Sequence, residues 1–266
     1  MPNRFAPIVK RTLARRPALY RRARRAHDIA RWLARRPHEP DFAFYRYAPP
    51  GAPGTIFLDV GANTGISALS FRIYDKHTPI VSIEPNATLE HDLRLVGRLA
   101  AGFEYRLVAA GSGRGELTLY TPCYRGTPLS GETSMERPVA GDVWWYEQNV
   151  RRAKSGDFSV IEQQVEVIPL DDFELAPAHV KIDVEGMELE VLRGMRRTLA
   201  EHRPTVLVER SEGFDEVCAW LSDLVGYRPA RWIWEDRRLV PLAPSDSPQN
   251  VFFVTSASPG YNGQNR

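Results

Sequence analysis

Two acidic residues that each end an apolar run are the strongest candidates for chemistry in this sequence. Asp59 ends one run and is followed by a glycine turn that closes at Gly65, and Glu84 ends a second run, 19 residues after Gly65. An acid about 20 residues after a glycine turn is typical of nucleotide-binding βαβ units, where its carboxylate binds a ribose diol. The spacing therefore predicts a cofactor that contains a nucleoside.

The glycine turn itself indicates which cofactor. Residues 59–65 read Asp-Val-Gly-Ala-Asn-Thr-Gly, with an acid two residues before the first glycine, and this differs from the GxGxxG pattern that suits a pyrophosphate. A carboxylate here would repel phosphate and attract a cation. S-adenosylmethionine carries a sulfonium and an ammonium, so we predict that the turn holds its methionine half. The predicted contacts are Asp59, Gly61, Ala62, Asn63, Thr64 and Gly65. The alternative is that Asp59 only caps the turn before the next helix.

The second acid and its neighbours are expected to hold the rest of the cofactor. The two oxygens of Glu84 match the two ribose hydroxyls, and Pro85 and Asn86 continue the same loop. Asn86 either supports this loop or caps the following helix. The small side chain of Ala109, at the end of another expected strand, leaves room for the adenine ring.

A second group of carboxylates, Asp183, Glu185 and Glu209, follows two later strand-like runs. The carboxyl ends of strands form the crevice in which open α/β sheets bind ligands. Neighbouring carboxylates raise one another's pKa, which suits a general base for an alcohol. We therefore expect Asp183 to lie nearest the reacting hydroxyl and the methyl group of the cofactor.

Each of these carboxylates also has a simpler interpretation. Glu185 fits a helix N-terminus, where the dipole favours an acid, and Glu209 fits an ion pair with Lys181 or Arg210. Alternatively, Asp183, Glu185 and Glu209 together bind a divalent metal such as Mg²⁺ that orients a diol. The sequence leaves metal dependence open.

The elements that must position these residues alternate between strand and helix. Apolar runs and helical periodicity predict strands near 55–60, 80–84, 104–109, 178–183 and 204–209, and helices near 65–75, 87–100, 187–201 and 214–225. Such alternation predicts an α/β fold with a parallel sheet, helices on both faces and right-handed crossovers. The last strand-like runs, 227–234 and 250–255, have no helix between them, so we expect an antiparallel pair.

Residues 121–160 interrupt this alternation and are expected to form a long insertion between strands at 116–120 and 163–168. A loop of this length inside a compact domain is usually functional or partly disordered. The aromatic residues could stack on a sugar ring, and an arginine could bind an anionic group on it. The candidates are Trp144, Trp145, Tyr146 and Arg151. The alternative is a local hydrophobic plug.

The first 40 residues are expected to form a basic arm, separate from a folded domain at 41–266. The arm holds 12 Arg or Lys and 2 acidic residues, whereas the remainder has 23 basic and 31 acidic residues. A helix is expected between Pro17 and Pro37, packed on the body by an apolar stripe. The stripe consists of Leu19, Ala23, Ala26, Ile29, Ala30 and Leu33. Alternatively, residues 4–36 meet an anionic membrane surface, an anionic glycan or an acidic partner, or act as an organellar transit segment.

Composition limits the remaining possibilities. The hydrophobic share of 43% and the charged share of 26% are ordinary for a globular protein. Cys123 and Cys218 lie far apart, which favours a reducing compartment. We expect a cytoplasmic protein, with attachment at the membrane surface through the arm as the alternative. No apolar run is long enough to span a bilayer, and no aromatic–basic module predicts specific nucleic-acid binding. The oligomeric state cannot be read from the sequence.

Four stretches of this sequence resemble the FkbM family of S-adenosylmethionine-dependent methyltransferases. They are Leu-Asp-Val-Gly-Ala-Asn-Thr-Gly (58–65), Ile-Glu-Pro-Asn (83–86), Leu-Asp-Asp-Phe (170–173) and Val-Lys-Ile-Asp-Val-Glu-Gly-Met-Glu-Leu-Glu-Val-Leu-Arg-Gly (180–194). The last stretch is the most discriminating, because it specifies acids and glycines over fifteen residues. The resemblance covers about residues 55–255 and leaves the arm outside.

The resemblance implies a Rossmann-like class I methyltransferase fold with a mostly parallel, seven-stranded sheet. It also implies methylation of a hydroxyl on a sugar, a glycan or a glycosylated natural product. Two alternatives remain: methylation of nitrogen or a carboxylate on a peptide or small metabolite, and a non-catalytic cofactor-binding module docked by its arm. The acceptor itself is not implied, because family members differ in the insertion.

Overall fold

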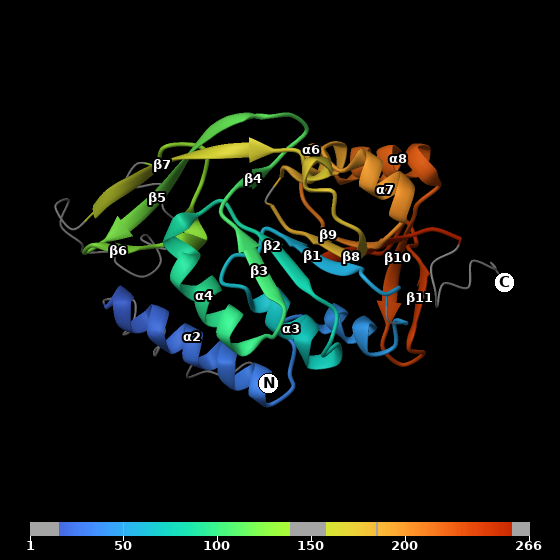
Figure 1. Ribbon diagram of the computed structural model, residues 1–266, viewed down its shortest axis with the longest axis horizontal. Helices are drawn as coiled ribbons and strands as arrows, with labels where there is room; N and C mark the ends of the chain where they lie inside the picture. Colours follow the sequence, from blue (N-terminus) through green and yellow to red (C-terminus); the bar gives the residue numbers. More distant parts are fainter. Residues whose placement is uncertain (1–15, 50, 139–157, 185, 257–266) are drawn as a thin grey trace.

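The chain folds into two β-sheets with helices packed around the larger one (Figure 1). The computed structural model describes residues 16–49, 51–138, 158–184 and 186–256. In that part of the chain, the larger sheet has eight strands in the order β11-β10-β12-β9-β8-β1-β2-β3. Their bounds are β1 (Ile56–Val60), β2 (Ile80–Ile83), β3 (Phe103–Arg106), β8 (Pro177–Ile182), β9 (Thr205–Glu209), β10 (Arg228–Ile233), β11 (Arg238–Pro241) and β12 (Asn250–Val254).

The larger sheet confirms the predicted α/β class and corrects the strand count. Parallel pairs join β3, β2, β1, β8 and β9, and β10 pairs antiparallel with β12 as expected. The prediction of seven strands is wrong in the described structure, because the chain after β10 folds back to form β11. The sheet is therefore mixed: five strands joined by parallel pairs are followed by three joined through antiparallel pairs.

A second, smaller sheet extends away from the first, and the strands β5 and β7 form its long ribbon (Figure 1). Among the described residues it has the order β4-β7-β5-β6. Its strands are β4 (Ala109–Ala110), β5 (Gly115–Tyr124), β6 (Thr127–Pro128) and β7 (Phe158–Ile168). The strands expected at 116–120 and 163–168 therefore form, but they pair with each other outside the main sheet. The strand expected at 104–109 is wrong at its end, because β3 stops at Arg106 and Ala109 belongs to the second sheet.

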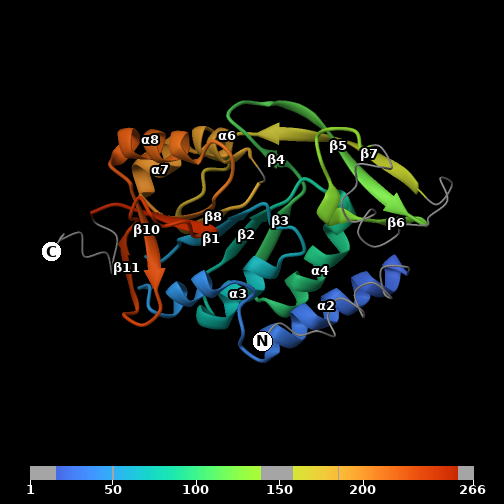
Figure 2. The ribbon, with the colours of Figure 1, turned by 180° about the vertical axis from the view of Figure 1, so that it is seen from behind.

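Helices cover both faces of the larger sheet, as predicted (Figures 1 and 2). On one face lie the helix α2 (Pro17–Leu33), the 3₁₀ helix η1 (Pro40–Arg46) and the helices α3 (Ile66–Tyr74) and α4 (Glu90–Leu99). On the other lie α6 (Glu188–Arg193), α7 (Arg196–His202) and α8 (Phe214–Val225). Short 3₁₀ helices occur at η2 (Ala87–Leu89), η3 (Ser130–Glu132) and η5 (Leu170–Phe173). The single helix expected at 187–201 is wrong, because α6 ends at Arg193 and a separate helix, α7, begins at Arg196.

Alternation along each strand directs side chains to two separate cores. On β1, Leu58 and Val60 pack with α6, α7 and α8, whereas Phe57 packs with η1 and α3. Asp59 lies between Leu58 and Val60 in sequence, so its side chain shares the face of Phe57. This parity places Asp59 on the side of the sheet that η1 covers.

The arm helix α2 packs on the body, but not through the predicted stripe. Leu19 is 45% exposed and Leu33 is 69% exposed. The inner face instead carries Arg21 and Arg25, which both form ion pairs with Asp92 of α4. These ion pairs, together with Trp32, which packs against the core on this face of the sheet, hold the helix on the body. Among the residues that the structure describes, no helix has the length and apolarity needed to cross a bilayer.

Candidate functional site

A cavity lies at the carboxyl ends of the parallel strands, between the two sheets. Its walls come from the ends of β1, β2 and β8, the strands β4 and β5, and the loop 130–135. Seven residues predicted to bind the cofactor line it: Gly61, Asn63, Glu84, Pro85, Asn86, Ala109 and Asp183. The other predicted contacts, Asp59, Ala62, Thr64 and Gly65, are not among its lining residues. The topology thus brings together residues that are more than 100 positions apart in sequence, such as Gly61 and Asp183.

Gly61 turns the chain at the end of β1, beside the cavity. Its φ is +79°, a conformation that side chains other than glycine rarely adopt. A Cβ atom here would lie 1.8 Å from the carbonyl oxygen of Asp183. The amide of Asp183 in turn donates to the carbonyl of Val60 at 3.0 Å. The absence of a side chain therefore lets the ends of β1 and β8 meet and leaves the backbone open to a ligand.

Glu84 presents its carboxylate to the same cavity. Its Oε2 accepts from the backbone amide of Asn63 at 2.7 Å, and its Oε1 accepts from the amide of Asn86 at 2.9 Å. Burial raises the pKa of Glu84 to about 7, against the effect of these two hydrogen bonds. Each oxygen keeps a further acceptor site. The geometry suits a pair of hydroxyl donors.

Asn86 performs both of the roles considered for it. Its Oδ1 accepts from the amide of Thr88 at 3.0 Å, which caps η2. Its Nδ2 donates to Oγ1 of Thr133 at 2.7 Å, and Thr88 also contacts Ser130 through their hydroxyls at 2.9 Å. These hydrogen bonds hold the loop 130–135 of the second sheet against the segment that follows β2.

Asp59 lies beneath the cavity. Its side chain is fully buried, and its Oδ2 accepts from Ser82 at 3.1 Å while Oδ1 has no partner in the described structure. Burial raises the pKa of Asp59 to about 6, against the nearby Lys181 ammonium and the Ser82 hydrogen bond. Asp59 and Lys181 are register partners on β1 and β8. The Asp59 carboxylate therefore raises the pKa of the neighbouring Lys181 ammonium without lining the cavity itself.

Asp183, Glu209 and the buried Lys181 form a hydrogen-bonded cluster of charges. The ammonium of Lys181 donates to Oδ2 of Asp183 at 2.8 Å, and Asp183 and Glu209 share a hydrogen bond. Burial raises the pKa of Asp183, but the hydrogen bond with Glu209 and the Lys181 charge outweigh it and hold that pKa below its usual range. The hydrogen bond with Asp183, together with burial, raises the pKa of Glu209 to about 7. One proton therefore binds this pair with an apparent pKa near neutrality.

Sequence reasoning missed His38 and Glu39, on which the charges of Lys181 and Asp183 act. It also missed Asp41, which shares a hydrogen-bond donor with Glu39. Asn250 donates from Nδ2 to Oε2 of Glu39 and Oδ2 of Asp41, both at 3.1 Å. His38 is bonded to Oγ of Ser70 at 2.8 Å, and burial, with the charge of Lys181, lowers its pKa to about 3. His38 is therefore neutral at pH 7. His38, Glu39 and Asp41 immediately precede the aromatic run 42–45, and the burial of that run brings them onto the sheet. Their position next to this run is the signal that sequence reasoning missed.

Several predicted residues lie outside the described part of the chain. They are Glu185, Trp144, Trp145, Tyr146 and Arg151, and their roles remain predictions. Among the described residues, no group of three or more histidine, cysteine, aspartate or glutamate side chains is arranged to hold a metal ion. The Asp183 carboxylate accepts a hydrogen bond from the Lys181 ammonium and shares another with Glu209.

The cavity of this α/β fold lies at the carboxyl ends of parallel strands, which is where open α/β sheets bind ligands. Residues 59–229 match the Methyltransferase FkbM domain, and this match covers more than half of the chain. The protein therefore belongs to the FkbM methyltransferase family, as the sequence motifs indicated. No curated protein matches the chain.

Two solved structures are similar to the chain. One is the methyltransferase FkbM from Methylobacillus flagellatus KT, at 19% identity and a TM-score of 0.47, with 79% of this chain and 47% of that chain covered. The other is a precorrin-6Y C5,15-methyltransferase from Geobacter metallireducens GS-15, at 12% identity and a TM-score of 0.40, with 80% and 83% covered. The chain thus spans about half the length of the first of these proteins.

Proposed function

We propose that this protein transfers a methyl group from S-adenosylmethionine to a hydroxyl on a sugar, a glycan or a glycosylated natural product. The observation that carries the proposal is that one cavity is lined by both Glu84 and Asp183. The first offers a carboxylate suited to a ribose diol, and the second belongs to a pair that binds a proton near pH 7. Family membership supports methyl transfer in general.

The residues at the cavity fit this cofactor. Glu84 would accept hydrogen bonds from both ribose hydroxyls, and the bare backbone at Gly61 would lie against the methionine half. Pro85 and Ala109 line the wall on which the adenine would rest. When bound, the cofactor supplies an electrophilic methyl group on sulfur. Most of the catalytic help in such a displacement is positioning of the reacting groups.

The pair of Asp183 and Glu209 is placed to accept the proton of the acceptor hydroxyl. Asp183 lines the cavity, and Glu209 lies behind it and bonds to Gln249 at 3.0 Å. A base is most effective when its pKa lies near the working pH, and the pair meets that condition. Lys181 holds Asp183 in its ionised form, so the pair can take up one proton without becoming neutral.

The location of the protein belongs to the same proposal. Cys123 and Cys218 are free thiols, which supports a reducing compartment such as the cytoplasm. The outer face of α2 exposes Leu19 and Leu33 beside exposed arginines. An apolar and basic face of this kind supports contact with an anionic membrane surface.

Calorimetric titration of S-adenosylmethionine tests the cofactor assignment. The variant Glu84→Ala should bind at least tenfold more weakly, because it loses two charge-assisted hydrogen bonds of the kind that are about twice as strong as neutral ones. Glu104→Ala, an exposed acid on β3, should bind as the wild type does. Equal affinity of Glu84→Ala and wild type would remove the ribose assignment. Formation of adenosylhomocysteine only when a hydroxylated acceptor is added then tests the transfer itself.

A further inference from the structure

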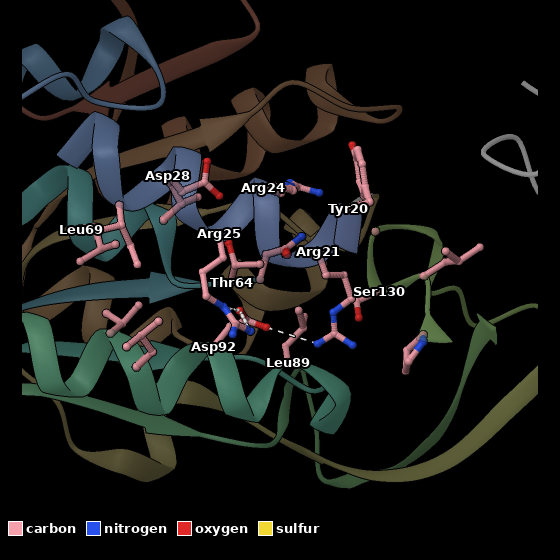
Figure 3. Close-up of a pocket in the computed structure, with 18 of the residues that line it drawn as sticks. Tyr20, Arg21, Arg24, Arg25, Asp28, Thr64, Leu69, Leu89, Asp92 and Ser130 are labelled. Atoms are coloured by element: carbon pink, nitrogen blue, oxygen red, sulfur yellow. Dashed lines mark hydrogen bonds and ion pairs between the residues drawn. The ribbon is translucent and has the colours of Figure 1, made fainter. Parts of the chain in front are cut away.

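A second cavity adjoins the cofactor cavity, and the arm helix α2 forms one of its walls (Figure 3). The opposite walls come from α4, the start of α3 and the loop at η3. Four residues line both cavities: Asn63, Leu89, Ser130 and Gly131. A molecule in the second cavity would therefore lie directly beside one in the first.

The wall formed by α2 carries three arginines. Leu19 and Leu33 point to solvent, whereas Arg21, Arg24 and Arg25 line the cavity. Moving a guanidinium out of water is costly unless an anionic group meets it. Arg21 and Arg25 are partly buried, and Arg24 is exposed where it lines the cavity. The wall formed by α2 therefore presents positive charge to a ligand that enters the cavity.

The protein's own acids do not balance that positive charge at one end of the cavity. Asp92 pairs with both Arg21 and Arg25, so two guanidinium groups share one carboxylate. Arg24 makes no hydrogen bond or ion pair with any residue in the described part of the chain. Two other acids line the cavity. Asp28 lies at the far end beside Leu69 (Figure 3), and Glu132 already has an interaction partner.

We propose that Tyr20, Arg21, Arg24 and Ser130, here called the arginine pocket, bind a phosphate or carboxylate group on the methyl acceptor. The planar guanidinium fork matches both anions in geometry and charge. Leu89 and Val96 line the same cavity and offer an apolar surface to the body of the acceptor. This inference rests on the proposed function and narrows the acceptor to a hydroxylated molecule that carries an anionic group.

Small anions test the pocket without knowledge of the full acceptor. The full-length protein is titrated with phenyl phosphate, phenylacetate and benzyl alcohol, which share an aromatic body and differ in charge. Phenyl phosphate and phenylacetate separate the phosphate from the carboxylate source. The variant Arg24→Gln should weaken binding of the preferred anion about tenfold, since one charge-assisted contact is lost. Arg22→Gln is the matched control, because Arg22 is exposed on the same helix and lies outside the cavity lining.

The outcomes separate this inference from the proposed function. Binding of an anion but not of benzyl alcohol, weakened by Arg24→Gln and not by Arg22→Gln, supports the pocket. Equal anion binding by the wild type and Arg24→Gln, or equal binding of benzyl alcohol, overturns it. S-adenosylmethionine is titrated into the same proteins. Its failure to bind a wild type that does bind the anion would overturn the proposed function and leave the pocket standing.

Discussion

At the scale of single residues, the candidate site depends on charges that are buried together. Lys181 is only 2% exposed, and burial alone would lower its pKa. The carboxylates of Asp59 and Asp183 outweigh burial and raise that pKa, so the ammonium persists. The ammonium then holds Asp183 ionised, and the proton of the pair rests on Glu209. Buried charges of this kind are costly unless paired, and Asp59, although it does not line the cavity, supplies one of the charges that stabilise the Lys181 ammonium.

The apparent pKa of the pair predicts how activity changes with pH. Below pH 7 the pair of Asp183 and Glu209 holds one proton, and above pH 7 it is free to accept one. We therefore expect kcat/KM to rise as pH increases through about 7. Glu209→Gln should lose this inflection and lower kcat about 10²-fold, the low end for general base catalysis. Glu212→Gln, an exposed acid nearby, should keep both.

The pH–rate profile and a ¹³C NMR titration of glutamate carboxyl groups provide the two measurements. The NMR titration follows the carboxyl directly and needs no acceptor. An inflection near pH 7 that persists unchanged in Glu209→Gln would assign the proton to another group.

At the scale of elements, the sequence predicted those helices and strands whose residue pattern is visible within a short window. Buried parallel strands appear in sequence as apolar runs, so β1, β2, β8 and β9 were identified within a few residues. The contacts of α2 with the body were not, because Asp92, which binds two of its arginines, lies far along the chain. β11 and the separate second sheet were missed for the same reason, since strand pairing between distant segments leaves no local signal. The site followed this division: Glu84 and Asp183 ended predicted strands, whereas His38, Glu39 and Asp41 reach it only through tertiary packing.

The break between α6 and α7 shows a tertiary contact overriding a helical pattern, and it yields a prediction. A Cβ atom at Gly194 would lie 1.9 Å from the carbonyl oxygen of Gly111, next to the second sheet. Gly194→Ala must therefore move backbone, and we expect it to lower the free energy of unfolding by about 1–3 kcal/mol, as overpacking does. Urea denaturation measures the change. Gly113→Ala has no heavy atom within 4 Å of its added methyl group and should be tolerated. If both variants are equally stable, the two chain segments do not meet as closely as described.

At the scale of the whole molecule, the first 47 residues contribute two different things. The helix α2 is bound to α4 by the ion pairs of Arg21 and Arg25 with Asp92, and it forms one wall of the arginine pocket. The segment that follows is part of the folded body, because Phe42, Phe44 and Tyr45 are buried in the core beneath β1 and β12. The same segment carries Glu39 and Asp41 to Asn250. The helix α2 ends at Leu33 and the next helix, η1, begins at Pro40, so the described part of the arm joins the folded body through residues 34–39.

Two truncations separate these contributions. Removal of residues 1–36 leaves the aromatic segment in place and removes the ion pairs with Asp92. We expect this protein to fold with a Tm lower by several degrees, at about 2–4 °C per kcal/mol for a chain of this size, and to bind S-adenosylmethionine within about threefold of wild type while losing phenyl phosphate. Removal of residues 1–47 also deletes three buried aromatic side chains, each worth about 3–5 kcal/mol in a core. That total is comparable to the whole stability of a domain, about 5–15 kcal/mol, so no cooperative unfolding transition should remain. Circular dichroism melting and calorimetry report both results, and a shorter protein that melts as cooperatively as the longer one would show that the segment is not part of the core.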